Sequence, residues 1–143
     1  MRHALYLAFV LLFAHAAHAA DGPTPKLLFD ATAPNAIKQL APNGPSQPEV
    51  SFKLVDKAIE VTIAANGKSS YPGIVLTPPT PWNLLGCGHV EAKITNTGTS
   101  FLRLSLRIDD NGPWQGEPYS AEKIGLKPGQ SGTVRNRAVM AGT

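Results

Sequence analysis

Hydrophobic and polar residues alternate along two stretches near the middle of the chain. Apolar residues occupy every second position from Val90 to Ile94, and again from Leu102 to Ile108. Because successive side chains of a strand leave opposite faces of a sheet, each stretch predicts a strand with one apolar and one polar face. This pattern is typical of an antiparallel sheet that covers a core on one side. The sequence therefore predicts an all-β domain.

A turn sequence, Asn-Thr-Gly-Thr at 96–99, separates these two stretches and favours their pairing as a hairpin. The apolar faces match if Ile94 lies opposite Leu102, which leaves a three-residue loop. They also match if Ile94 lies opposite Leu104, which leaves a five-residue loop. The second register avoids placing a lysine beside an arginine, so we favour it on charge.

A second pair of alternating segments, 50–55 and 58–64, is joined by the two-residue link Asp56-Lys57. A link of this length fixes the register of a hairpin, and here it places apolar residues opposite apolar residues on the same face. The predicted pairs are Leu54 with Ile59, Phe52 with Val61 and Val50 with Ile63.

Shorter apolar runs predict further strands at 71–77 and 124–126, a last weak strand from Thr133, and an entry strand at 27–29. The segment Lys-Pro-Gly-Gln at 127–130 predicts a turn. No helical periodicity of useful length follows the first twenty residues. About eight short strands at this spacing are typical of an antiparallel β-sandwich, here of jelly-roll type.

The first 19 residues have the pattern of a secretory signal peptide. Arg2 and His3 form a short basic start, residues 5–13 are apolar, and Ala-His-Ala at 17–19 fits the small-residue cleavage rule. The apolar run is too short to span a bilayer as a helix. The sequence therefore predicts cleavage after residue 19 and a secreted or periplasmic protein.

Cleavage would leave 124 residues, from 143 minus 19, which is the size of a single domain. We expect an N-terminal extension over 20–48 and the β-sandwich over 49–143. The net charge would be 12 basic minus 10 acidic residues, or +2, with no basic cluster of the kind that a phosphate backbone needs. Nucleic acid and membrane are therefore not expected partners of the mature chain. Cys87 is the only cysteine, which excludes an intramolecular disulfide, and we expect it to pack as a small apolar group.

Five short motifs resemble those of a known family: Trp82-Asn83-Leu84, Gly88-His89-Val90, Asn96-Thr97-Gly98-Thr99, Leu104 to Asp109 and Leu126-Lys127-Pro128-Gly129-Gln130. The chain resembles the galactose-binding-like jelly-roll modules of bacterial carbohydrate-active proteins, which often precede the catalytic domain of glycoside hydrolases such as β-agarases. The resemblance covers roughly residues 49–134 and implies a non-catalytic domain that holds a polysaccharide.

The chain departs from that family in two places. Asn83 stands where the family commonly has aspartate, and residues 134–140, with two arginines and little alternation, replace a final apolar strand. We therefore expect a module that lacks its final strand, as a truncated product or a fragment of a larger polypeptide. A missing strand would expose backbone hydrogen-bonding groups and favour association.

Sugar recognition combines aromatic faces, which pack on the C–H face of a ring, with planar polar groups that satisfy its hydroxyls. The loop 109–119 and the polar face of the strand before it offer both kinds of group. The alternative is that Trp114 packs over the edge of the core and that the charges are only solvated, whereas for Trp82 a core position is expected. The candidate carbohydrate-binding residues are Trp114, Tyr119, Arg103, Arg107, Asp109 and Asn111.

Catalytic and metal-binding motifs are weakly represented. The chain has no Gly-x-Ser-x-Gly, His-Glu-x-x-His or phosphate-loop sequence, so we expect a non-enzyme without a cofactor. His89 and Glu91 share a strand face, but two ligands do not make a metal site. A structural calcium ion, which many jelly rolls hold, is left open. Two other functions also stay open: a structural or protein-interaction domain that pairs through an exposed strand edge, and an N-terminal piece of a glycoside hydrolase.

Overall fold

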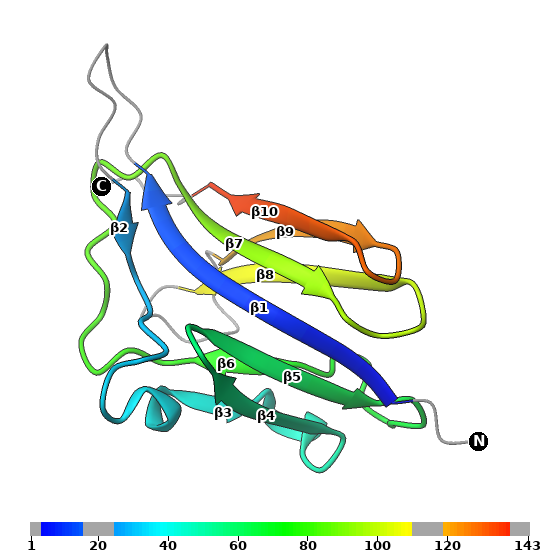
Figure 1. Ribbon diagram of the computed structural model, residues 1–143. Helices are drawn as coiled ribbons and strands as arrows, with labels where there is room; N and C mark the ends of the chain where they lie inside the picture. The colour runs from blue at the N-terminus through cyan, green and yellow to red at the C-terminus, as the bar shows by residue number, and fades with distance from the viewer. Residues whose placement is uncertain (1–3, 16–24, 110–118, 138–143) are drawn as a thin grey trace.

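The computed structural model describes residues 4–15, 25–109 and 119–137, with the backbone alone for the first of these ranges. The described residues form antiparallel strands and two short 3-10 helices, which confirms the all-β prediction (Figure 1). No helix among them is long and apolar enough to cross a membrane. The elements are β1 (Ala4–His15), β2 (Lys26–Leu27), η1 (Ala36–Gln39), β3 (Leu40–Pro42), η2 (Gly44–Ser46), β4 (Val50–Val55), β5 (Ala58–Ala64), β6 (Ile74–Leu76), β7 (His89–Asn96), β8 (Leu102–Asp109), β9 (Tyr119–Leu126) and β10 (Ser131–Asn136).

One six-stranded sheet and two smaller ribbons make up this part of the chain. The large sheet has the order β10-β7-β1-β5-β4, with β2 paired to β1. The small ribbons are β3-β6 and β8-β9, and both lie beside the large sheet in Figure 1. Residues of all three sheets share one buried apolar cluster, so each sheet covers the same core. The sandwich of jelly-roll type remains a prediction, which this arrangement does not by itself decide.

The β4–β5 hairpin has the predicted register. Leu54 lies opposite Ile59, and the pairing continues along the two strands to Val50 opposite Ile63. Asp56 in the link has a φ of 52°, a left-handed conformation that aspartate tolerates better than most residues. The local sequence was sufficient here because a two-residue link leaves the strands no other register that keeps both apolar faces on the core.

The predicted hairpin between the strands around the turn at 96–99 is wrong. β7 pairs with β1 and β10, whereas β8 pairs with β9, so the two strands belong to different sheets. Apolar residues of both strands still enter the same buried cluster, Ile94 from β7 and Leu102 from β8. The alternation of apolar and polar residues predicts which side chains face the core, but it does not identify the hydrogen-bonded neighbour of a strand.

The chain before residue 49 contributes to the core. Phe29 and Ala36 are buried, and β3 pairs with β6 through Leu40 opposite Leu76. The expected entry strand at 27–29 overlaps the two-residue strand β2 only at Leu27, whereas Leu28 and Phe29 are buried beyond the end of β2. Part of the predicted N-terminal extension therefore packs with the domain, because its buried apolar residues belong to the shared cluster.

Residues 4–15, which the sequence predicts to lie in a signal peptide, form strand β1 between β5 and β7 (Figure 1). The sequence predicts that this segment is removed from the mature fold, whereas the structure places it in the middle of the large sheet. Continuous apolar runs are found both in leader peptides and in strands that are buried on both faces. Cleavage after residue 19 stays a prediction.

The C-terminal segment is more regular than its composition predicts. β10 begins at Ser131 and pairs with β7 along its length, and Val134 is buried. The Asn136 amide, also fully buried, donates to the backbone carbonyls of Leu106 and Ser120, at 2.9 and 2.7 Å. Residues 131–136 thus tie the large sheet to the β8–β9 ribbon. β9 is likewise longer than the short strand predicted at 124–126, since it begins at Tyr119.

Two smaller predictions are confirmed in the connecting segments. Trp82 and Cys87 are half-buried and pack against the apolar cluster. The turn at 127–130 closes with a hydrogen bond from the Gln130 N–H to the Lys127 carbonyl, and Gly129 supplies the positive φ of 73° that the turn needs.

Gly132 in β10 faces the β9 side chains without room for a side chain of its own. A Cβ at this position would lie 2.7 Å from Ile124 Cδ1 and 2.9 Å from Leu126 Cδ2, inside the packed core. We expect Gly132→Ala to destabilise the protein by about 1–3 kcal/mol through overpacking. Urea denaturation of the variant would check this, with Gly73→Ala as the matched control, because a Cβ at Gly73 meets nothing within 4 Å. Equal midpoints for the two variants would contradict the packing argument.

Candidate carbohydrate-binding face

The β8–β9 ribbon has one face on the core and one face in solvent. The even-numbered residues of β8, from Leu102 to Ile108, pack against the buried cluster, and Ile124 and Leu126 of β9 join them. Residues opposite each other in an antiparallel pair share a face, so the exposed partners line the other side. We call this side the outer face of β8–β9. Its cross-strand pairs are Arg103 with Gly125, Ser105 with Lys123, Arg107 with Ala121 and Asp109 with Tyr119.

Three of the predicted site residues meet at one end of this outer face. Two guanidinium nitrogens of Arg107, Nε and Nη2, each lie 2.6 Å from Oδ1 of Asp109. The Arg107 guanidinium carbon lies 4.1 Å from the centre of the Tyr119 ring, in cation–π contact. Tyr119 is nevertheless 47% exposed. The ion pair therefore orients the guanidinium over the ring, and the ring keeps accessible surface for a ligand.

Arg103 lies on the same outer face, farther along β8, opposite Gly125. Among the described residues of this face, Arg103, Arg107 and Lys123 are cationic and Asp109 is anionic, so three positive charges minus one negative leave an excess of +2. Arg107 and Asp109 form the one ion pair among the described residues of this face. A ligand rich in hydroxyl or carboxylate oxygens would suit such a surface, because cationic donors favour oxygen acceptors.

Phe101 is an aromatic residue of this surface that is not among the site residues predicted from the sequence. It is 57% exposed, and a Cβ at Gly125 would lie 2.7 Å from its Cζ, so the ring lies over the glycine. The sequence carries a hint, because Phe101 interrupts the alternation just before Leu102. The contact of Phe101 with Gly125 could not be predicted from the sequence, since the pairing of β8 with β9 was not predicted.

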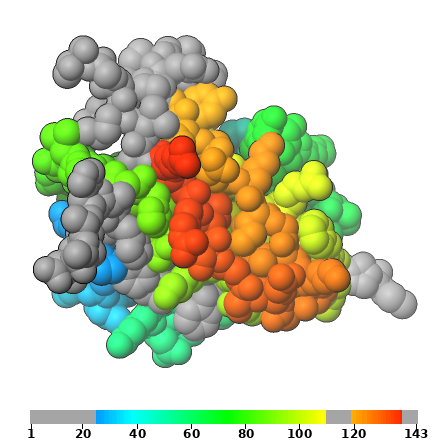
Figure 2. Space-filling view, turned by 90° about the horizontal axis from the view of Figure 1, so that it is seen from above, coloured from blue at the N-terminus to red at the C-terminus, as the bar shows by residue number. Residues whose placement is uncertain are grey.

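Two predicted site residues, Trp114 and Asn111, fall within 110–118 and lie outside the described residues. The structure therefore brings together Arg107, Asp109 and Tyr119, with Arg103 on the same face, and does not test the other two. Figure 2 shows the surface over β9 and β10, in orange to red, as one continuous side of the molecule.

The polar face of β7 differs from its predicted exposure. Glu91 is only 6% exposed, and its carboxylate pairs with Arg135 Nε at 3.0 Å and lies 3.6 Å from His89 Nε2. Arg135 of β10 lies directly opposite Glu91, so its side chain lies against the carboxylate on this side of β7. Within the described residues, no group of three or more potential ligands could hold a metal ion.

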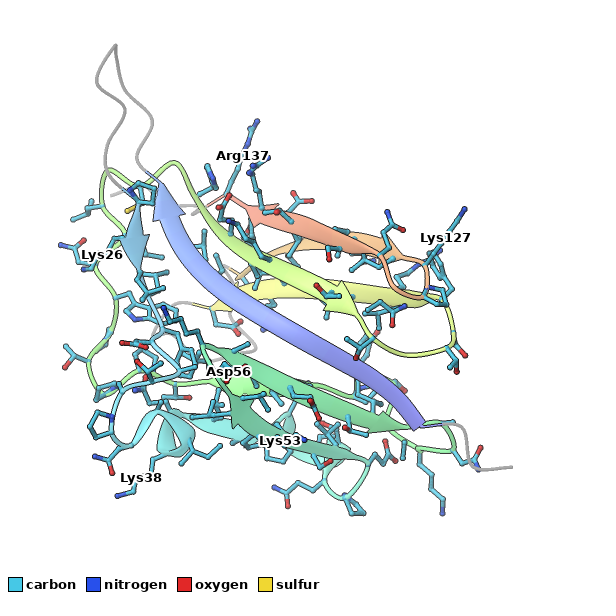
Figure 3. All side chains as sticks on the ribbon, viewed as in Figure 1. Lys26, Lys38, Lys53, Asp56, Lys127 and Arg137 are labelled. Atoms are coloured by element: carbon cyan, nitrogen blue, oxygen red, sulfur yellow. The ribbon has the colours of Figure 1, made fainter. Side chains whose placement is uncertain are left out.

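Basic residues are spread over the described surface. Figure 3 shows Lys26, Lys38, Lys127 and Arg137 at separate places on the molecule, and Lys53 pairs with Glu60 at 2.9 Å. These five residues do not by themselves form the continuous positive stripe that nucleic-acid binding uses.

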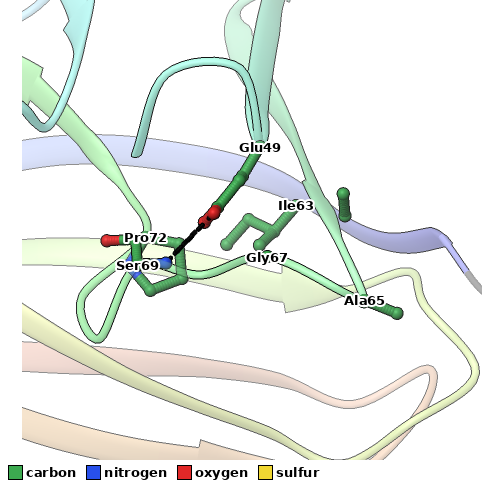
Figure 4. Close-up of a pocket in the computed structure, with 7 residues that line it drawn as sticks. Glu49, Ile63, Ala65, Gly67, Ser69 and Pro72 are labelled. Atoms are coloured by element: carbon green, nitrogen blue, oxygen red, sulfur yellow. Dashed lines mark hydrogen bonds between the residues drawn. The ribbon is translucent and has the colours of Figure 1, made fainter. Parts of the chain in front are cut away.

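Two other carboxylates are held by local hydrogen bonds. Glu49 lines a shallow hollow, where its carboxylate accepts hydrogen bonds from the backbone N–H groups of Lys68 and Ser69 (Figure 4). Hydrogen bonds from the Thr32 hydroxyl and backbone N–H lower the pKa of the Asp30 carboxyl from its usual value. Each carboxylate closes its own loop or turn, so neither arrangement provides the facing pair of carboxyl groups that glycoside hydrolysis requires.

Comparison with known proteins identifies no relative: no family model matches the chain, and neither the curated proteins nor the solved structures contain a match. The functional assignment therefore depends on the residues and their geometry.

Proposed function

We propose that this protein is a secreted, non-catalytic carbohydrate-binding module that holds a polysaccharide on the outer face of β8–β9. The observation that carries the proposal is the Arg107–Asp109–Tyr119 cluster, in which an ion pair orients a guanidinium over an exposed ring. An aromatic ring beside planar hydrogen-bonding groups is the combination that sugar rings require. Because these groups are already oriented, a ligand would spend little free energy on ordering them.

The length of the outer face supports a polymer as the ligand. Phe101 lies near one end and Tyr119, opposite Asp109, lies at the other. At about 3.4 Å per strand residue, the eight steps from residue 101 to residue 109 span roughly 27 Å. Several sugar rings fit along such a distance, with Arg103, Ser105 and Lys123 between the two aromatic residues.

The resemblance to galactose-binding-like modules, drawn from the sequence motifs, supports the same class of ligand. The resemblance makes the module an accessory part of a glycoside hydrolase. Trp114 and Asn111 join the proposed site because the loop 109–119 supplies an aromatic ring and a planar amide. Carbohydrate binding, export and this accessory role all belong to the proposal.

Tyr119→Ala is expected to abolish retention of the protein by its polysaccharide while changing the melting temperature little, because the Tyr119 ring is half exposed and lies outside the buried cluster. Affinity electrophoresis in gels that contain agarose, galactan, xylan or β-glucan, compared with a gel without polymer, would measure this. Trp114→Ala, tested in the same gels, would show whether the loop residue also contacts the sugar.

Tyr71→Ala is the matched control, because Tyr71 is an exposed tyrosine, 81% accessible, that lies off the outer face of β8–β9. Retention that Tyr71→Ala and Tyr119→Ala reduce equally would contradict the proposed site. A folded protein that no polymer retards would favour the protein-interaction function instead.

A further inference from the structure

β1 lies in the interior of the large sheet and is paired along both edges. Its register with β5 runs from Ala4 opposite Ala64 to Ala8 opposite Glu60, and its register with β7 ends at His15 opposite His89. β1 is therefore the strand that joins β5 and β4 to β7 and β10. The sequence predicts that this same segment is removed with the leader peptide.

Removal of β1 would leave a gap that the remaining strands cannot close directly. β1 is antiparallel to both β5 and β7, so β5 and β7 run parallel to each other. Two strand spacings, roughly 9.6 Å, separate them. Their backbone N–H and C=O groups that now bond to β1 would face the gap without partners. Two unpaired strand edges that face each other favour the addition of another strand between them.

We propose that, after cleavage following residue 19, the gap between β5 and β7 is a binding site for an extended apolar segment of a partner polypeptide, which adds there as a strand antiparallel to both. The proposal rests on the predicted cleavage and is independent of carbohydrate binding, because the outer face of β8–β9 is not part of the gap. Strand addition of this kind combines main-chain hydrogen bonds with recognition of alternate side chains.

The flanking strands define the chemistry of the partner segment. Val61 on β5 and Val90 and Ala92 on β7 are buried, so the partner needs apolar residues at the positions opposite them. The register of β1 with β7 shifts between Ala8 and Leu11, so an accepted strand carries one extra residue there. In β1 the facing pairs are Leu5 with Ile63, Leu7 with Val61, Leu12 with Ala92 and Ala14 with Val90.

The test uses the full chain, produced without export, with a protease recognition sequence inserted between residues 19 and 20. Cleavage after folding separates β1 from the domain, and a fluorescent peptide of residues 4–15 with flanking lysines for solubility is then added. We expect the labelled peptide to exchange into the cleaved domain, which fluorescence anisotropy and native mass spectrometry would detect as a one-to-one complex.

Two proline variants of the peptide test the mode of binding. Leu7→Pro removes a backbone N–H at a position paired with both β5 and β7, and we expect binding to weaken by about tenfold or more. Val10→Pro is the matched control, because residue 10 lies within the register shift and has no paired position on either strand. We expect it to bind more tightly than the Leu7→Pro peptide.

Three results would overturn the proposal. One is a cleaved domain that loses residues 4–15, keeps its melting temperature and takes up no peptide, since the gap would then have closed. Another is a cleaved domain that forms dimers which the peptide does not dissociate, since a second copy would then be the occupant. The third is a domain that unfolds on cleavage and does not refold when the wild-type peptide is present.

Discussion

Asn96→Asp is expected to destabilise the protein by roughly 3 kcal/mol or more, the largest effect that we predict for a single conservative substitution. Asn96 is fully buried at the end of β7. Its amide Nδ2 donates to the carbonyls of Ser100 and Leu126, at 2.8 and 3.0 Å, and its Oδ1 accepts from the Gly98 N–H at 3.0 Å. A carboxylate at this position loses both donors and directs a negative charge at two carbonyl oxygens.

The position of Asn96 explains why the loss would spread through the fold. Its backbone also bonds to the turn at 127–130, through Gln130 and Gly129. One residue thus joins the end of β7, the loop to β8 and the end of β9. Chemical denaturation at neutral pH would measure the loss, with Asn66→Asp in an exposed turn as the matched control. Similar stabilities for the two variants would contradict the buried network.

The Asn96→Asp variant should also depend on pH in a defined direction. Burial and the facing carbonyls favour the neutral carboxyl, so its pKa in the folded state lies above the unfolded value of about 3.9. The destabilisation is therefore smallest below that unfolded pKa and grows as the pH rises through and above it. Denaturation midpoints of variant and wild type, compared between acid and neutral pH, would show whether the difference in stability grows with pH in this way.

Ile94→Ala is expected to cost about 2–5 kcal/mol, because it removes a large side chain from the centre of the core. Ile94 is 1% exposed and belongs to the buried cluster that all three sheets share. It lies opposite Gly132 of β10, which has no side chain to fill the space that alanine would leave. Thermal and urea denaturation would measure the loss.

Ile37→Ala is the matched control for that substitution, because Ile37 is 43% exposed. We expect its effect to stay well below that of Ile94→Ala, since most of the removed surface is already in contact with water. Ile94→Val should fall between the two, at about 0.5–1.5 kcal/mol. A different order of the three stabilities would contradict the position of the core.

The candidate site shows both the reach and the limit of prediction from sequence. Alternation along β8 predicted that Arg103, Arg107 and Asp109 share one exposed face, and the structure agrees. It could not show that Tyr119 lies opposite Asp109, because that contact requires β9 to pair with β8. Phe101 was missed for the same reason, since only the pairing places Gly125 beneath its ring.

The sequence by itself determined the all-β class, the core-facing residues of the alternating strands and the complete register of the β4–β5 hairpin. These features depend on side-chain alternation and short links, which act over a few residues. The tertiary structure alone decided that β7 and β8 belong to different sheets, that residues 4–15 lie between β5 and β7, and that Glu91 is covered. Those features depend on which strands become neighbours, and several arrangements bury the same apolar faces, so local sequence does not choose between them.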